Sequence, residues 1–109
     1  MRSFTAAITA SGVSLPEQRL TNSELEKMVD TSDQWIASRT GIRERRILPE
    51  GLSALDLSLQ AARRTLNASD LEPEQLDLII VATVTSDYPL PSTACLVQAG
   101  LGAYQAAAM

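Results

Sequence analysis

A tryptophan and an arginine at helical spacing are the residues of this chain best suited to chemistry. Trp35 and Arg39 lie in the stretch TSDQWIASRTGIRERR, which runs from Thr31 to Arg46 and contains the only tryptophan of the chain. Residues four apart on an α-helix share one face. A flat aromatic ring beside a guanidinium, with the hydroxyls of Thr31 and Thr40 nearby, is a suitable platform for a purine base and its phosphates.

A short helix has to hold this pair in place. Thr31 or Ser32 can cap its N-terminus, and Gly41 can end it in a left-handed conformation. The same pattern also fits an amphipathic helix that buries Trp35 and leaves its arginines in solvent, since tryptophan is often interior. Spacing alone leaves both interpretations open.

The absence of histidine excludes several catalytic mechanisms within the 109 residues. A histidine general base, a Cys-His dyad and a Ser-His-Asp triad all need an imidazole. The single cysteine, Cys95, cannot form an internal disulfide, which fits a reducing compartment. With one cysteine and no histidine, we expect no metal site.

Charge and hydropathy narrow the class of ligand. The net charge of −4 argues against nucleic-acid binding, while Arg39, Arg43, Arg45 and Arg46 form a local basic cluster that favours a small phosphorylated ligand. No apolar run is long enough to span a bilayer, and the N-terminal apolar run is short and broken by polar residues. We therefore expect a cytoplasmic protein with no membrane partner.

Predicted strands and helices alternate along the chain, which is typical of an α/β domain. Strands are expected at residues 3–12, 43–48, 77–85 and 104–109. Helices are expected at Ser23–Val29 after a capping box, at 31–40, at 53–67 and from 91 or 92 to 100, with one turn at 73–76. Leu25 and Met28 are expected on the buried side of the first helix. The apolar run from Leu78 to Val84 predicts a strand that is buried on both faces.

The order of these motifs resembles the β-ketoacyl-acyl-carrier-protein synthases III of the thiolase-like superfamily. The matching sequences are SLPEQRLTNSELEKMVDTSDQWIASRTGIRERRI and DLIIVATVTSDYPLPSTACLVQAGLG, which together cover most of the chain. The resemblance implies a layered αβαβα fold, of which residues 1–109 supply the first part of the N-terminal half. Because the chain stops inside an apolar run, we expect a fragment that exposes apolar patches and folds weakly by itself.

The same resemblance implies an activity. Members of this family condense an acyl-CoA primer with malonyl-acyl-carrier-protein, which releases carbon dioxide and starts fatty acid synthesis. A cysteine thiolate takes the acyl group from CoA, and a His and an Asn stabilise the charge that develops as malonyl decarboxylates. The implied substrate is acyl-CoA with no prosthetic group, the implied partner is malonyl-acyl-carrier-protein, and the full-length protein is expected to be a homodimer.

The resemblance also assigns roles to individual residues. Thr31, Trp35 and Arg39 match the positions that lie against the CoA nucleotide, with the indole stacked on the adenine, which favours the platform interpretation. The other wall of the adenine slot comes from beyond this chain. Leu90 matches a residue that reaches the acyl pocket of the partner subunit, where many relatives carry Phe. The smaller Leu90 is expected to admit primers longer than acetyl, unless it only packs the dimer.

The catalytic Cys, His and Asn of the family do not carry over, because they lie beyond Met109. Cys95 lies on a predicted helix, in PSTACLVQ, where it is expected to pack as a small hydrophobe. The fragment alone is therefore expected to be inactive. Two alternatives stay open: a starter-unit synthase of secondary metabolism, for a polyketide or an alkylquinolone, and a non-catalytic CoA-binding module complete at this length.

Overall fold

The computed structural model describes residues 5–109, which form two compact units. One unit is Leu15–Leu52, and the other combines residues 5–14 with Ser53–Met109. The elements in chain order are β1 (Arg19–Thr21), α1 (Asn22–Leu25), α2 (Asp33–Thr40), β2 (Glu44–Arg46), α3 (Ala54–Asn67), the 3-10 turn η1 (Pro73–Gln75), β3 (Leu78–Ile79), α4 (Thr93–Leu101) and β4 (Ala107–Ala108). Helices and strands are interspersed, as predicted for an α/β chain.

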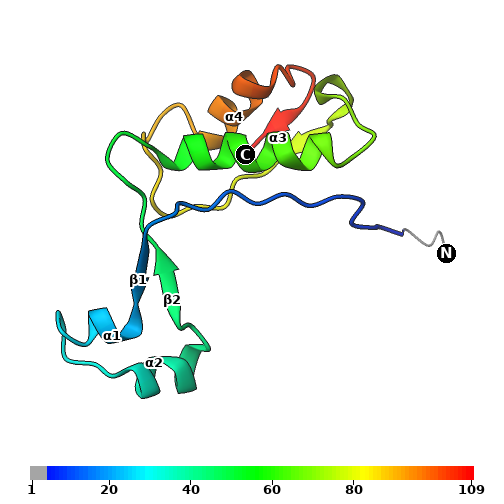
Figure 1. Ribbon diagram of the computed structural model, residues 1–109. Coiled ribbons are helices and arrows are strands. Elements are labelled where there is room, and N and C mark those ends of the chain that lie inside the picture. Colours follow the sequence, from blue (N-terminus) through cyan, green and yellow to red (C-terminus); the bar gives the residue numbers. More distant parts are fainter. Residues whose placement is uncertain (1–4) are drawn as a thin grey trace. The chain divides into compact units, whose positions relative to one another are not determined.

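The unit Leu15–Leu52 is an antiparallel β1–β2 pair with α1 and α2 in the connection between the strands (Figure 1). Thr21 pairs with Glu44 at the end of β1 and begins α1 through the predicted capping box. Its hydroxyl accepts the N–H of Glu24 at 3.3 Å. The backbone N–H and the hydroxyl of Thr21 both donate to the Glu24 carboxylate, each at 2.8 Å, and hold the pKa of Glu24 below its usual value.

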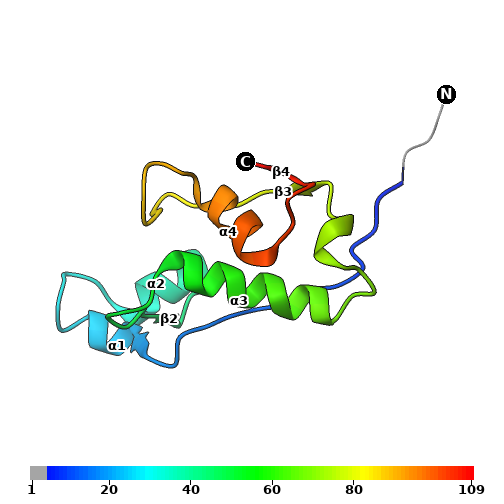
Figure 2. The same cartoon turned by 90° about the horizontal axis from the view of Figure 1, so that it is seen from above.

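The second unit is built on α3, with α4 packed beside it (Figure 2). Ser53 caps α3 as predicted, since its hydroxyl accepts the N–H of Asp56 at 3.2 Å. The two helices approach closely at Gly100, where an added Cβ would lie 2.6 Å from Leu59 Cδ2. The helix α4 connects β3 to β4, which pair in parallel in the register Leu78–Ala107 and Ile79–Ala108. This is the smallest form of a parallel β-α-β connection.

The core of the described chain is small. Its buried apolar side chains are Ile36 in one unit and, in the other, Ala94, Val97, Ala103 and Ala106 on and after α4. Many large apolar side chains are exposed instead, among them Ile8, Ile80, Val84, Leu90, Tyr104 and Met109. Exposed apolar side chains are therefore present as expected, while their gathering into patches and weak folding stay predictions.

The strands are much shorter than predicted. Residues 5–12 of the predicted strand 3–12 form no strand, and residues 3 and 4 lie outside the described part of the chain. The predicted strand 77–85 contracts to β3, and Val84 is fully exposed, so burial on both faces is wrong for this chain. A strand needs neighbours for its backbone hydrogen bonds, and within residues 5–109 only the two residues of β4 pair with β3.

The helices follow the prediction more closely, with one exception. Within residues 5–109, three of the four α-helices and the turn η1 lie within two residues of their predicted bounds. The N-caps of these three helices are Ser32, Ser53 and Ser92. The exception is the predicted helix Ser23–Val29, which ends at Leu25 and leaves Met28 exposed, against the expectation. Four residues give one helical turn, too little for propagation to stabilise.

Two kinds of feature are missing from residues 5–109. No helix there has the length and apolarity to cross a bilayer. In the same residues, no group of three or more His, Cys, Asp or Glu side chains could hold a metal ion.

Candidate functional site

The helix α2 presents the tryptophan–arginine pair, and its two ends are capped by its own sequence. The Ser32 hydroxyl accepts the N–H of Trp35 at 3.1 Å, which satisfies one of the free donors at the helix start. Gly41 ends the helix at φ 73°, in the left-handed region, and its N–H donates to the carbonyl of Ala37 at 2.9 Å. Both predicted caps are confirmed, with Ser32 rather than Thr31 at the N-cap.

Trp35 and Arg39 lie together on the exposed side of α2. The guanidinium carbon of Arg39 is 5.3 Å from the centre of the Trp35 ring, within the range of a cation–π contact. The indole is 54% exposed, whereas Ile36 is the buried residue of this helix. The interpretation in which the helix buries Trp35 is therefore wrong for this chain, and the indole is available to a ligand.

A shallow cavity of about 350 Å³ lies at the N-terminal end of α2. Its lining residues are Asp30, Thr31, Ser32 and Trp35. Two of the predicted site residues, Thr31 and Trp35, thus line one cavity. The third, Arg39, lies against the ring of Trp35. An aromatic wall with a few polar groups beside it is the usual composition of a small-molecule site.

Asp30 is a member of this cavity that the sequence analysis missed. A carboxylate accepts hydrogen bonds and disfavours anions, so Asp30 suits a ligand that presents an amino group here and keeps its phosphates elsewhere. Its position directly before Thr31 is the signal that could have identified it.

Thr40 does not contribute a free hydroxyl to the platform, against the expectation. Its Oγ1 donates to the carbonyl of Ile36 at 2.7 Å and accepts the N–H of Ile42 at 3.1 Å. The hydroxyl therefore closes the C-terminal turn of α2, a common use of threonine near a helix end.

Two of the remaining arginines of the basic cluster, Arg45 and Arg46, make contacts within the unit of the β1–β2 pair, whereas Arg43 is exposed. Glu44 forms ion pairs with Arg19 at 3.4 Å and with Arg46 at 3.9 Å, and Arg46 also donates to the carbonyl of Pro16 at 2.8 Å. Exposed pairs of this kind are worth less than about 1 kcal/mol. These contacts account for Arg46 without a ligand, and Arg45 Nη2 donates to Asn22 Oδ1 at 2.9 Å.

Two further residues of interest, Leu90 and Cys95, lie in the other unit. Leu90 is 83% exposed in the loop before α4. Cys95 lies in the first turn of α4, where its N–H donates to the Ser92 hydroxyl at 3.3 Å and its sulfur lies 3.2 Å from the same oxygen. Its contacts are those of a partly buried helix residue beside a cap.

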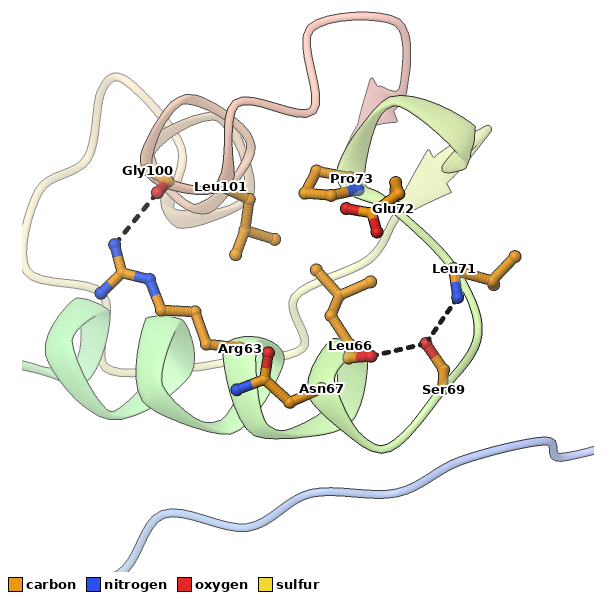
Figure 3. A pocket seen from close by; sticks show the side chains of 9 residues that line it. All are labelled: Arg63, Leu66, Asn67, Ser69, Leu71, Glu72, Pro73, Gly100 and Leu101. Carbon is orange, nitrogen blue, oxygen red and sulfur yellow. Dashed lines mark hydrogen bonds between the residues drawn. The ribbon is translucent and has the colours of Figure 1, made fainter.

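A larger cavity, of about 390 Å³, lies between the C-terminal half of α3, the end of α4 and η1 (Figure 3). The Arg63 guanidinium at its edge donates to the carbonyl of Gly100 at 3.1 Å, and the Ser69 hydroxyl donates to the carbonyl of Leu66 at 2.8 Å. Its polar groups thus hold α3, α4 and the following loop together. We interpret it as a gap between packed helices, with no predicted site residue in its lining.

Curated proteins of known name align with most of this sequence. No protein-family model matches it. It is 58% identical over 103 residues to the β-ketoacyl-acyl-carrier-protein synthase III of Caldanaerobacter subterraneus subsp. tengcongensis, and 60% identical over 103 residues to that of Natranaerobius thermophilus. Each alignment covers 94% of this chain and 31% of the relative. The chain therefore spans less than a third of the length of these relatives.

The backbone of this chain is similar to part of several solved synthase structures. A 3-oxoacyl-acyl-carrier-protein synthase III from Aquifex aeolicus matches with a TM-score of 0.75 and 55% identity, over 87% of this chain and 30% of the other. The synthase III of Thermus thermophilus matches with a TM-score of 0.77 and 42% identity, over 93% and 32%. The priming β-ketosynthase of the R1128 polyketide pathway matches with a TM-score of 0.79 and 30% identity, over 92% and 30%.

Proposed function

Because this chain belongs to the β-ketoacyl-acyl-carrier-protein synthase III family and shares its thiolase-like fold over the aligned part, we propose that it forms one wall of an acyl-CoA site. At full length the protein condenses an acyl-CoA primer with malonyl-acyl-carrier-protein and so starts fatty acid synthesis. It acts as a cytoplasmic homodimer, and acyl-CoA is a substrate rather than a bound cofactor.

The exposed indole of Trp35 carries this proposal. A tryptophan that is 54% exposed and has a guanidinium 5.3 Å from its ring centre offers a rigid, flat surface to a purine. Stacking of a base on an aromatic side chain contributes about 1–3 kcal/mol. Adenine covers apolar ring surface that is otherwise in water, while Thr31 and Asp30 offer polar atoms beside it.

The chain contributes binding rather than thioester chemistry. Arg39 holds the indole and adds positive charge near the nucleotide, and Thr31 lines the cavity beside it. The Cys, His and Asn that form and use the acyl-enzyme belong to the part of the family sequence that follows this chain. Leu90 reaches the acyl pocket of the partner subunit and widens it relative to Phe.

The fluorescence of the single tryptophan tests the proposed adenine contact directly. We expect a saturable change in Trp35 emission when the 109-residue chain is titrated with CoA, because a stacked purine alters the environment of the indole. Pantetheine has no purine and serves as the matched control. A chain that responds to neither ligand, or equally to both, would contradict the proposal.

A starter-unit synthase of secondary metabolism is a second candidate function. It is favoured by the TM-score of 0.79 to the R1128 priming ketosynthase, although the identity to that protein is 30%, against 55% for the Aquifex aeolicus synthase. A primer competition at full length separates the two. A preference for acetyl-CoA favours fatty acid synthesis, and a preference for a longer or aromatic primer favours the starter-unit role.

A further inference from the structure

We propose that Asn22 is a positioning residue, which fixes the orientation of α2 and so holds the Trp35–Arg39 pair ready for a nucleotide. This inference rests on the proposed function, because it gives a role to a residue behind the same site. Asn22 is 2% exposed and is the largest fully buried side chain in the described residues. A buried amide of this kind has to be hydrogen-bonded through all its polar atoms, or it destabilises the fold.

Every polar group of the Asn22 side chain has a partner, and the partners come from three different segments. Its amide nitrogen donates to Asp33 Oδ1 at 2.8 Å and to the carbonyl of Ile42 at 2.7 Å. Its carbonyl oxygen accepts from Arg45 Nη2 at 2.9 Å. Its backbone N–H donates to the carbonyl of Arg43 at 3.1 Å. One side chain therefore joins the start of α2, the segment that follows α2, and β2.

The helix α2 needs such an external support. It has eight residues, and helices shorter than about 12–15 residues are marginal by themselves. It buries only Ile36, so apolar packing gives it a single anchor about which it can turn. Asp33 lies in its first turn and Ile42 directly follows its Gly41 cap, so the Asn22 amide group restrains both ends. Because Asn22 holds both ends of α2, the helix face that carries Trp35 and Arg39 keeps a single orientation.

Arg45 makes the amide of Asn22 hard to replace. Its Nη1 is buried and has no hydrogen-bond partner among residues 5–109, so the bond from Nη2 to Asn22 is the one that satisfies this guanidinium. Aspartate at position 22 offers an acceptor to Arg45 but no donor to Asp33 or Ile42, and alanine offers neither. The site therefore requires a side chain that both donates twice and accepts, which is an amide.

Four variants of the full chain test the inference through the emission of Trp35. In Asn22→Ala we expect CoA to bind about tenfold more weakly, equivalent to about 1.4 kcal/mol, and the anisotropy of unliganded Trp35 to fall because α2 loses its bonds to Asn22 at both ends. Asn67→Ala is the matched control, since Asn67 is the other asparagine of the chain and is exposed; it should change the affinity less than twofold. In the pair Asn22→Asp with Asp33→Asn, the new amide at position 33 can donate to the new carboxylate, so part of the loss should be recovered relative to Asn22→Asp alone.

Each outcome of this experiment is decisive. If Asn22→Ala keeps its secondary structure, binds CoA like the unchanged chain and leaves the anisotropy of Trp35 as it was, the inference is overturned. If the unchanged chain does not bind CoA but Asn22→Ala still mobilises Trp35, the proposed function fails and the positioning role of Asn22 stands. If Asn22→Ala unfolds, Asp33→Ala removes one bond at an exposed residue and should weaken CoA binding about threefold; an unchanged affinity in that variant overturns the inference.

Discussion

Replacement of Trp35 by alanine measures the proposed adenine contact at its centre. A stacked base contributes about 1–3 kcal/mol, which corresponds to about 5- to 140-fold in affinity at tenfold per 1.4 kcal/mol. The contact with Arg39, 5.3 Å from the ring centre, is lost as well, and an exposed cation–π pair adds about 0.5–1 kcal/mol of support for the ring. Because the proposed slot has a second wall besides Trp35, we expect the lower part of this range, about 5- to 30-fold.

A chimera gives this prediction a kinetic assay. The chain replaces the matching part of the Caldanaerobacter subterraneus relative, to which it is 58% identical over 103 residues. In this chimera, Trp35→Ala should raise the KM for acetyl-CoA about 5- to 30-fold and change kcat less than twofold, since the loss is one of ground-state binding. Trp35→Phe keeps a ring and should have a smaller effect.

Acetyl-pantetheine decides whether the lost contact is with adenine. This primer carries the same thioester without the nucleotide, so Trp35→Ala should leave its kinetics unchanged. An equal loss with acetyl-CoA and acetyl-pantetheine would show that Trp35 supports the fold rather than the base, and an unchanged KM for acetyl-CoA would remove Trp35 from the site altogether.

Three further predictions concern packing, pH and primer choice. Gly12→Ala should lower the free energy of unfolding by about 1–3 kcal/mol in a denaturant titration, because the added Cβ would lie 2.6 Å from the backbone nitrogen of Thr65 in α3. The bonds from Thr21 lower the pKa of Glu24. The ionised carboxylate therefore stabilises the fold at pH values above the usual pKa of 4.5, and this stabilisation is lost as the pH falls through the lowered pKa. Glu24→Gln should make the melting temperature less dependent on pH in this range. In the chimera, Leu90→Phe should reduce the use of isobutyryl- and octanoyl-CoA relative to acetyl-CoA in a primer competition, and strict acetyl preference before the substitution would refute the role given to Leu90.

Apart from the end of α1, the sequence predicted the helix ends well, because capping is local chemistry. Ser32, Ser53 and Ser92 each accept an N–H three residues on, and Gly41 adopts a positive φ that other residues avoid. Each of these bonds joins residues within one turn, so a short stretch of sequence contains both partners. The tryptophan–arginine pair was predictable for the same reason, since residues 35 and 39 are four apart on the helix that these caps define.

The strands were not predictable in length because their partners are distant in the sequence. The run from Leu78 to Val84 has strong strand propensity, yet only the two residues of β3 find a neighbour. Propensity and an apolar pattern describe a strand inside a complete sheet, whereas the extent of pairing depends on which other strands are present. Ile80 and Val84 lie beyond the paired residues of β3 and are exposed.

Asn22 shows why a residue that supports a site is difficult to predict from the sequence alone. It follows the N-cap of α1 inside a capping box, where a polar residue is common and indicates no special role. Its hydrogen-bond partners are 11, 20 and 23 residues away in the sequence. Yet the unit Leu15–Leu52 is shorter than the roughly 40 residues below which domains usually need a disulfide, a metal or a partner chain to fold. Its only buried apolar side chain is Ile36, so apolar packing specifies little of its shape. The orientation of Trp35 must then depend on polar contacts, and those of Asn22 are the ones that reach both ends of the helix that carries it.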